Sequence, residues 1–394
     1  MKNLSADTLK QEFQQHFPDI NPNQIQVIKA PGRVNLIGEH TDYNDGFVLP
    51  VAINYYTYIA FSPYPARELH IIASDFGNEL IIIDLDKPLQ KQAAGNWKNY
   101  VLGVVQEMLN KNLALTGGKL LISGNVPVGA GLSSSASLEI ALIRALTILS
   151  ENIIDPTLAA IIGQAAENNF VGCSCGIMDQ LISARGEESS ALLIDCENLS
   201  TKSVSIPNDW ALLIVHSGVK RGLVDSEYNL RRQQCETVAK YFGQSSLRKV
   251  TLEQLFAAEN KLDTPNNLDT LSFRRARHVL TENKRTLLAA DALAAGNMPA
   301  LVTLMAESHQ SMRDDFNITT ASIDKLVEIM TAAGNGNAGV RMTGGGFGGC
   351  VISIAPADII PQLIAAVERN YKLATGCTPT LIPAKAVAGA FAAQ

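Results

Sequence analysis

The chain has 394 residues, a formal net charge of −6 and 46% hydrophobic residues, which together favour two domains with sizeable cores. Since no long basic run interrupts the acidic balance, binding to nucleic acid or to a membrane surface is disfavoured. No stretch reaches the length of a membrane span, the segment 1–17 lacks the apolar core of a signal peptide, and the six cysteines lack zinc-site spacing. We therefore expect a cytoplasmic protein whose cysteines are reduced.

The first third of the chain is predicted to contain a short helix, several strands and a second helix. An amphipathic helix over residues 4–17 ends before Pro18, and a strand over 25–30 follows it. Segments 51–62 and 69–83 alternate or run apolar, as strands do. Trp97 and Tyr100 lie at helical spacing within 96–108, a pattern more typical of a core than of a ligand platform.

The strand over 25–30 leads into a segment rich in chemically active side chains. Arg33, Glu39, His40 and Asp42 stand there among three glycines and a proline, a mixture too irregular for a core element. The two acids can accept hydrogen bonds from sugar hydroxyls, His40 can accept or donate, and the planar fork of Arg33 suits phosphate oxygens. The alternative is a polar surface loop stabilised by a local arginine–carboxylate pair.

The stretch Pro127–Ser137 combines glycines with three consecutive serines between an apolar run at 120–122 and a periodic helix over 138–149. Glycines let the backbone approach a ligand, amides at a helix start favour anions, and a serine hydroxyl can bind Mg²⁺. The stretch is neither a Walker A motif nor a dinucleotide fingerprint. Taken alone it could also be an ordinary turn that caps a helix.

Further helices are predicted over 157–170, 177–184, 224–241, 252–256, 273–295, 298–314 and 358–374. A strand over 191–195 is expected to pair with 211–215, and strands are expected over 350–354 and after 378. Because strands and helices do not alternate as regular βαβ units, we expect an α+β protein of two domains, 1–205 and 206–394. Gly344, Gly346 and Gly349 fit Gly-x-Gly-x-x-Gly, but the strand-like sequence that follows excludes a dinucleotide site.

Three motifs resemble those of the galactokinases, within the wider family of galacto-, homoserine, mevalonate and phosphomevalonate kinases. Residues 32–46 resemble the galactose signature, 127–137 the phosphate loop and 341–350 the C-terminal motif, and the stretches 166–168, 176–180 and 226–229 match as well. The resemblance implies an N-terminal domain like the second domain of ribosomal protein S5, a ferredoxin-like C-terminal domain, and an active site between them. It implies transfer of the γ-phosphoryl of ATP to the C1 hydroxyl of α-D-galactose, the committing step of the Leloir pathway, with Mg²⁺ as the cofactor.

The same resemblance assigns roles to residues, some of which sequence alone would read differently. Asp179 would be the catalytic base and Arg33 would stabilise the transferring phosphoryl group, although an acid in the first turn of an apolar helix is by itself more often a helix-start charge. Ser135 and Glu167 would bind the metal. The sugar would be bound by Glu39, His40, Thr41, Asp42, Gly176 and Tyr228. The nucleotide would be bound by Ser74, Trp97, Gly129, Ala130, Gly131, Leu132, Ser133, Ser134 and Ser135.

Two alternatives stay open at this point. One is a non-catalytic galactose and ATP sensor on the same scaffold, and the other is a sister enzyme such as an N-acetylgalactosamine or mevalonate kinase. In each case galactose or a related small molecule and ATP are the expected partners, and we expect a monomer.

Overall fold

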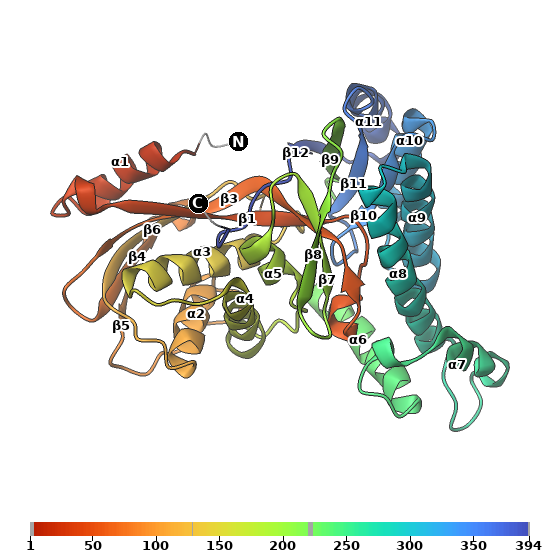
Figure 1. The fold of residues 1–394 in the computed structure, drawn as a ribbon, viewed down its shortest axis with the longest axis horizontal. Coiled ribbons are helices and arrows are strands. Elements are labelled where there is room, and N and C mark those ends of the chain that lie inside the picture. The colour runs from red at the N-terminus through yellow and green to blue at the C-terminus, as the bar shows by residue number, and fades with distance from the viewer. Residues whose placement is uncertain (1–3, 128, 220–223, 393–394) are drawn as a thin grey trace.

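The fold is that of a computed structural model, in which residues 4–127, 129–219 and 224–392 are described. Val128 of the predicted phosphate loop lies outside these ranges. Figure 1 shows a sheet with helices on both faces at one end of the molecule and a second sheet backed by long helices at the other. Within the described ranges, no helix combines the length and the apolar character needed to cross a membrane.

The N-terminal half contains a five-stranded sheet of order β1-β3-β6-β4-β5. Helix α1 covers one face, and α2, α3, α4 and α5 cover the other (Figure 1). Alternation along β3 explains this arrangement: Ala60 packs in a cluster with Leu9 of α1, whereas Ile59 and Phe61 pack with Val104 of α2. The strands are β1 (Gln26–Asn35), β3 (Pro50–Pro63), β4 (Glu68–Ala73), β5 (Leu80–Asp84) and β6 (Gly118–Gly124). The helices are α1 (Ala6–His16), α2 (Lys98–Asn110), α3 (Ser134–Leu149), α4 (Pro156–Ala165) and α5 (Met178–Arg185).

A small sheet of β2 (Phe47–Val48), β7 (Ser190–Asp195) and β8 (Ser200–Ser205) lies between the two larger ones. Strand β7 pairs with β2 and β8, while β9 (Trp210–His216) belongs to the C-terminal sheet. The predicted pairing of 191–195 with 211–215 is therefore wrong. The strand that pairs with β7 is β8, whose polar sequence buries only Val204 and therefore lacks the apolar alternation that predicts a strand.

The C-terminal half is built on a sheet of order β10-β11-β9-β12 whose neighbours are all antiparallel. In chain order it reads strand, helices, two strands, helix, strand, which is the ferredoxin-like connection. This agrees with the predicted α+β class. The remaining strands are β10 (Gly339–Thr343), β11 (Cys350–Pro356) and β12 (Thr380–Ala384). The helices are α6 (Val224–Tyr241), α7 (Leu252–Ala257), α8 (Thr270–Ala294), α9 (Met298–Ser311), α10 (Ala321–Gly334) and α11 (Ile360–Thr375).

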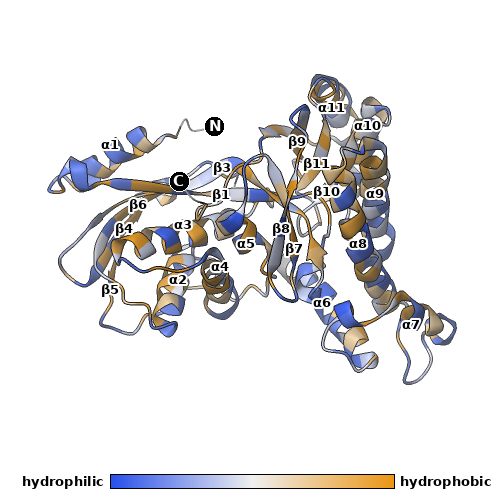
Figure 2. Cartoon of the chain, in the orientation of Figure 1, coloured by the Kyte–Doolittle hydropathy of each residue, from blue (hydrophilic) through white to orange (hydrophobic). Residues whose placement is uncertain are grey.

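Both faces of the C-terminal sheet are buried, which explains the continuous apolar run of β9. Leu213 and Val215 pack in a cluster with α10 and α11, whereas Leu212 and Ile214 pack in a cluster with Val34 of β1. The second cluster joins the two halves of the molecule. By contrast, Figure 2 shows the polar surface helices α1 and α6 largely in blue.

The segment after β12 returns to the N-terminal half and packs against α5. The amide of Val387 donates to the carbonyl of Ala52, and the amides of Ala390 and Phe391 donate to carbonyls within α5, at 2.9 Å and 3.1 Å. Val387 and Ala390 are buried, and the Phe391 ring lies under the guanidinium of Arg144. The end of the described chain therefore braces the helix that carries Asp179.

A chain that ends at Lys385 should unfold more easily because it exposes the surface that Val387, Ala390 and Phe391 cover. Burial of this size contributes about 2–4 kcal/mol to the free energy of unfolding. Urea unfolding of the shortened chain should show a lower midpoint. Leu373→Ala, at a position that is 85% exposed, is the control and should leave the midpoint in place. An unchanged midpoint in the shortened chain would contradict the bracing role.

Candidate active site

A cavity of about 640 Å³ lies where the three motifs meet. Its walls come from β1 and the loop after it, the loop before α3, the turn after α4, α5, α6 and the β10–β11 turn. The predicted site residues that line it are Arg33, Glu39, His40, Asp42, Gly129, Gly131, Leu132, Ser133, Ser134, Ser135, Glu167, Gly176, Asp179 and Tyr228. Gly344 and Gly345 of the third motif also line it.

Arg33 connects the phosphate loop to Asp179. Its Nε and Nη2 donate to the two carboxylate oxygens of Asp179, at 2.7 Å and 2.8 Å, and its Nη1 donates to the carbonyl of Gly131 at 2.6 Å. The hydroxyl of Ser133 donates to the same carboxylate. Arg33 is buried, so this two-pronged pair lies in a medium of low dielectric, where charge-assisted hydrogen bonds are strong. The carboxylate of Asp179 is therefore held in one orientation in the wall of the cavity.

A close backbone contact places Arg33 beside the loop. The amide of Arg33 donates to the carbonyl of Leu132 at 3.1 Å, and a Cβ on Gly32 would lie 2.6 Å from that carbonyl oxygen. Only glycine fits between the strand and the loop at this point. The register of β1 against β3 shifts between Pro31 and Arg33, which is the kind of irregularity that re-aims a side chain next to a functional site.

The phosphate loop turns tightly and ends at the start of α3. Gly129, Gly131 and Ser133 all have positive φ angles, of 75°, 78° and 59°. In the described part of the chain no side chain caps the start of α3, so its first amides are free to bind an anion. Ala130 is buried, and its carbonyl accepts a hydrogen bond from the thiol of Cys350 in the third motif. This contact secures the loop from the C-terminal half.

Glu167 lies in a π-helical turn, Ala166–Val171, that continues α4. Such turns are frequent at functional sites. Its carboxylate interacts with the hydroxyl of Ser135 and accepts a hydrogen bond from the amide of Gln180 at 2.8 Å. Burial and the nearby charge of Asp179 raise the pKa of Glu167 to about 7. A cation beside this carboxylate would stabilise its charged form.

The galactose signature places two further carboxylates in the cavity. Glu39 accepts hydrogen bonds from the amide of Gly344 at 2.6 Å and from the side chain of Asn35 at 2.8 Å. Asp42 lies against Gly176, where an added Cβ would approach its Oδ2 to 1.9 Å. Burial and the charge of Asp179 raise the pKa of Asp42 to about 7, so this carboxyl group can accept or donate at neutral pH.

His40 lies in an aromatic cluster beside these acids. Its Nδ1 is 2.8 Å from the hydroxyl of Tyr43, and its ring contacts those of Tyr228 and Phe316 at centroid distances of 5.2 Å and 4.6 Å. Burial and the neighbouring His278 lower the pKa of His40 to about 3. The imidazole is therefore neutral at physiological pH, with one nitrogen able to donate and the other to accept.

Four of the predicted residues do not line the cavity. The hydroxyl of Thr41 hydrogen-bonds the carbonyls of Gly38 and Phe47 and so holds the turn of the signature. Trp97 stacks on Phe76 at 5.3 Å, and Ser74 lies near the carbonyl of Ile122. The nucleotide-binding role of Ser74, Trp97 and Ala130 stays a prediction, as does the sugar-binding role of Thr41.

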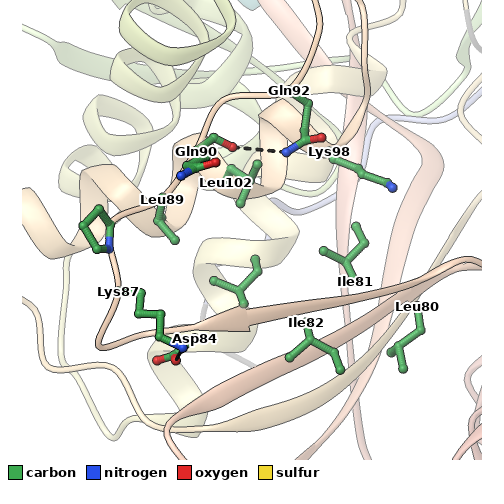
Figure 3. A pocket seen from close by; sticks show the side chains of 12 residues that line it. Leu80, Ile81, Ile82, Asp84, Lys87, Leu89, Gln90, Gln92, Lys98 and Leu102 are labelled. Carbon is green, nitrogen blue, oxygen red and sulfur yellow. Dashed lines mark hydrogen bonds and ion pairs between the residues drawn. The ribbon is translucent and has the colours of Figure 1, made fainter.

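Sequence reasoning missed several residues that build or support the site. Ala94, Gly95 and Tyr100 line the cavity. The helical spacing of Tyr100 from Trp97 was the one sequence feature that pointed to this segment. A separate cavity of about 390 Å³, between β5 and α2, is lined mostly by aliphatic side chains and contains none of the predicted residues (Figure 3).

A buried polar network supports the galactose signature from the C-terminal half. Glu282 of α8 accepts hydrogen bonds from the amide of Gly38 at 3.0 Å, from Ser308 at 2.6 Å and from Arg285 at 2.8 Å. Arg341 lies between the carboxylates of Glu39 and Glu282, at 3.7 Å and 3.9 Å. Although burial raises the pKa of Glu282, the charges of Arg285 and Arg341 lower it to about 2. His278 hydrogen-bonds the hydroxyl of Ser311 and the carbonyl of Glu39.

Comparison with known proteins gives consistent matches over most of the chain. Family models match the galactokinase galactose-binding signature at residues 11–63, the N-terminal domain of GHMP kinases at 99–187 and the GHMP kinase C-terminal domain at 289–373. The structure of Lactococcus lactis galactokinase complexed with galactose is similar at 32% identity and a TM-score of 0.90, covering 97% of this chain and 98% of that one.

More distant structures share the fold alone. Mevalonate kinase of Methanococcus jannaschii is 20% identical with a TM-score of 0.65, covering 92% of this chain and 98% of that one. Phosphomevalonate kinase of Streptococcus pneumoniae is 13% identical with a TM-score of 0.65, covering 92% of this chain and 100% of that one.

Removing the charge of Glu282 should destabilise the protein because Arg285 and Arg341 would lose a buried partner. Breaking such a pair costs about 3–5 kcal/mol. The folded pKa of about 2 lies below the ordinary value, so this stability is present above pH ~4.5 and is lost as the pH falls toward 2. Urea unfolding of Glu282→Gln should therefore differ most from wild type near pH 7 and less at pH 4. The exposed Glu307→Gln is the control. If Glu282→Gln were as stable as wild type at pH 7, or if the difference in unfolding free energy between them grew at lower pH, the network would not have this stabilising role.

Proposed function

The chain belongs to the galactokinases of the GHMP kinase family, and from this membership we propose how its own residues phosphorylate galactose with ATP. The product is galactose 1-phosphate, formed by transfer of the γ-phosphoryl group to the C1 hydroxyl. The observation that carries the proposal is the Arg33–Asp179 pair, which lies in the cavity between the phosphate loop and the galactose signature.

Asp179 acts as the base for the C1 hydroxyl. A phosphoryl transfer needs positioning and charge stabilisation more than covalent help, and the attacking hydroxyl must lose its proton during the reaction. The carboxylate of Asp179 reaches the cavity while Arg33 and Ser133 fix its orientation. Two N–H groups of the Arg33 guanidinium donate to this carboxylate and hold its oxygens in place to accept that proton.

Arg33 has a second task in the transition state. Its guanidinium lies between the carboxylate of Asp179 and the carbonyl of Gly131 in the phosphate loop. A phosphoryl group passing from that loop toward Asp179 comes close to this positive charge, which stabilises the charge spread over the transferring oxygens. The free amides at the start of α3 bind the β- and γ-phosphates from the other side.

The donors on Ser135 and Glu167 fit Mg²⁺. Both residues offer oxygen atoms, which a hard cation prefers, and their side chains are in contact. The described residues contain no group of three or more histidines, cysteines or acids that could hold a metal ion by itself. Mg²⁺ keeps waters and shares phosphate oxygens, so a hydroxyl and one carboxylate suffice. When bound there, the ion supplies neutralisation of the charge on the β- and γ-phosphates.

The sugar lies against the galactose signature. Glu39, Asp42 and the neutral His40 offer acceptors and donors for its hydroxyls. The ring of Tyr228 packs against the ring of His40. Gly176 gives room for Asp42 to turn into the cavity. We assign recognition of the axial C4 hydroxyl, which distinguishes galactose from glucose, to Asp42. The domain boundary at 205/206, the monomeric state and the cytoplasmic location stay predictions.

Asp179→Asn keeps the shape of the side chain but removes the base. Turnover should fall by about 10²–10⁴-fold, while galactose and ATP still bind with little change. Steady-state kinetics and equilibrium dialysis of both substrates test this. Asp155→Asn is the control because asparagine caps α4 as well as aspartate does. Near-wild-type kcat in Asp179→Asn would rule out this base.

Ser135→Ala and Glu167→Gln each remove one proposed metal ligand. Both should raise the Mg²⁺ concentration needed for half-maximal rate and should leave ATP binding without metal almost unchanged. Activity titrated with Mg²⁺, together with ATP binding in chelator, provides the two measurements. Wild-type titration curves in both variants would exclude these residues from the metal site.

Asp42→Ala should severely reduce galactose turnover and narrow the preference for galactose over glucose. Glucose leaves the acceptor for the axial hydroxyl unpaired, which costs about 1–3 kcal/mol, or about 5-fold to more than 100-fold in kcat/KM. Only galactose loses a matched partner in the variant. Tyr228→Phe is the comparison and should weaken galactose while keeping the preference. If Asp42→Ala leaves the ratio of the two kcat/KM values in place, another group recognises C4.

A further inference from the structure

Gln180 is a fully buried polar residue that immediately follows Asp179 on α5. Its Nε2 donates to Oε2 of Glu167 at 2.8 Å and to Oε2 of Glu139 at 3.0 Å. It does not line the cavity. Gln180 therefore touches one proposed metal ligand from behind without facing the substrates.

The amide nitrogen of Gln180 faces the carboxyl groups of Glu167 and Glu139. A primary amide has two N–H groups on nitrogen and only acceptor lone pairs on oxygen. The two N–H groups therefore match the two carboxyl oxygens, one on Glu167 and one on Glu139. The side chain is also confined by α4, since a Cβ on Gly163 would lie 3.0 Å from Cγ of Gln180 and 3.4 Å from Glu139.

Glu139 supplies the fixed end of this arrangement. It lies on α3, one turn after Ser135, and is fully buried. Among the described residues it has no salt bridge, and Gln180 is the hydrogen-bond partner of its Oε2. A buried acid without a cation is costly in a core, and the neighbours of Glu139 on α3, Ile140 to Ile143, are buried apolar residues. The hydrogen bond to Glu139 fixes the amide of Gln180, so that its second N–H is directed at Glu167.

We propose that Gln180 is a positioning residue for the metal carboxylate: anchored by Glu139, its amide occupies Oε2 of Glu167 and turns the other oxygen toward Ser135 and the ion. This inference rests on the proposed role of Glu167 as a metal ligand. Outer hydrogen-bond partners of this kind orient metal ligands and affect metal affinity strongly.

The arrangement also links two parts of the reaction. Asp179 and Gln180 are neighbours on one turn of α5, and their side chains leave the helix toward different partners: Arg33 and Ser133 for the base, Glu167 for the amide. The position of this turn therefore sets both the base and the metal carboxylate.

Gln180→Met tests the proposal because methionine has a similar length but no N–H. The Mg²⁺ concentration for half-maximal rate should rise by about 10–100-fold. Binding of Mn²⁺, followed by electron paramagnetic resonance in the presence of galactose and a non-hydrolysable ATP analogue, should weaken by a similar factor, while ATP affinity in chelator stays unchanged. Gln106→Met, the same change on the surface of α2, is the control and should leave all three in place.

Glu139 provides a second test that leaves Gln180 intact. Glu139→Leu should weaken Mn²⁺ binding without lowering the unfolding temperature. Glu139→Gln can still accept a hydrogen bond from Gln180 and should bind Mn²⁺ as the wild type does. In the double variant Glu139→Leu with Gln180→Met, the first change should add nothing to the second because it acts through Gln180.

Two results would overturn the inference, and they have different meanings. If Glu167→Gln shifts the metal titration but Gln180→Met and Glu139→Leu do not, Gln180 has a purely structural role while the metal site stands. If Glu167→Gln itself leaves Mn²⁺ binding unchanged, the assignment of the metal carboxylate is wrong, and the inference fails with it.

Discussion

The site depends first on the ion pair between Arg33 and Asp179. Arg33 is buried and uses three nitrogen donors, two on the carboxylate and one on the carbonyl of Gly131. Arg33 is the more buried partner, so a chain without a hydrogen-bond acceptor at position 179 would leave its guanidinium poorly compensated. The pair therefore fixes the distance between the proposed base and the phosphate loop, and it does so before either substrate arrives. Preorganisation of this kind is the main contribution that a protein makes to phosphoryl transfer.

The second constraint is that each half of the molecule completes the other. The β10–β11 turn holds Glu39 of the galactose signature through the amide of Gly344, and Cys350 at the start of β11 holds the phosphate loop through the carbonyl of Ala130. Glu282 on α8 holds the amide of Gly38. The backbone of the third motif thus lies close to both the galactose signature and the phosphate loop. This explains why a sugar kinase needs a ferredoxin-like half that contributes few side chains to the cavity.

Much of the site could be predicted because its chemistry lies in short motifs. Arg33, Asp42 and Ser135 were found from residue type, spacing and resemblance, and all three line the cavity. The strand β8 was missed because an edge strand buries one residue in six. Helix α10 was missed although Ile323, Leu326, Val327 and Met330 repeat at helical spacing and are buried. The contact between Gln180 and Glu139 could not be predicted, since it depends on how three helices pack.

The most direct test of the account is a crystal structure of this chain with galactose, Mg²⁺ and a non-hydrolysable ATP analogue. We expect the C1 hydroxyl of galactose within about 3.2 Å of the carboxylate of Asp179, with the γ-phosphate beside Arg33 and in line with that hydroxyl. A complex in which the C1 hydroxyl faces away from Asp179, or in which the γ-phosphate lies out of reach of Arg33, would contradict the central claim that this ion pair joins the two substrates.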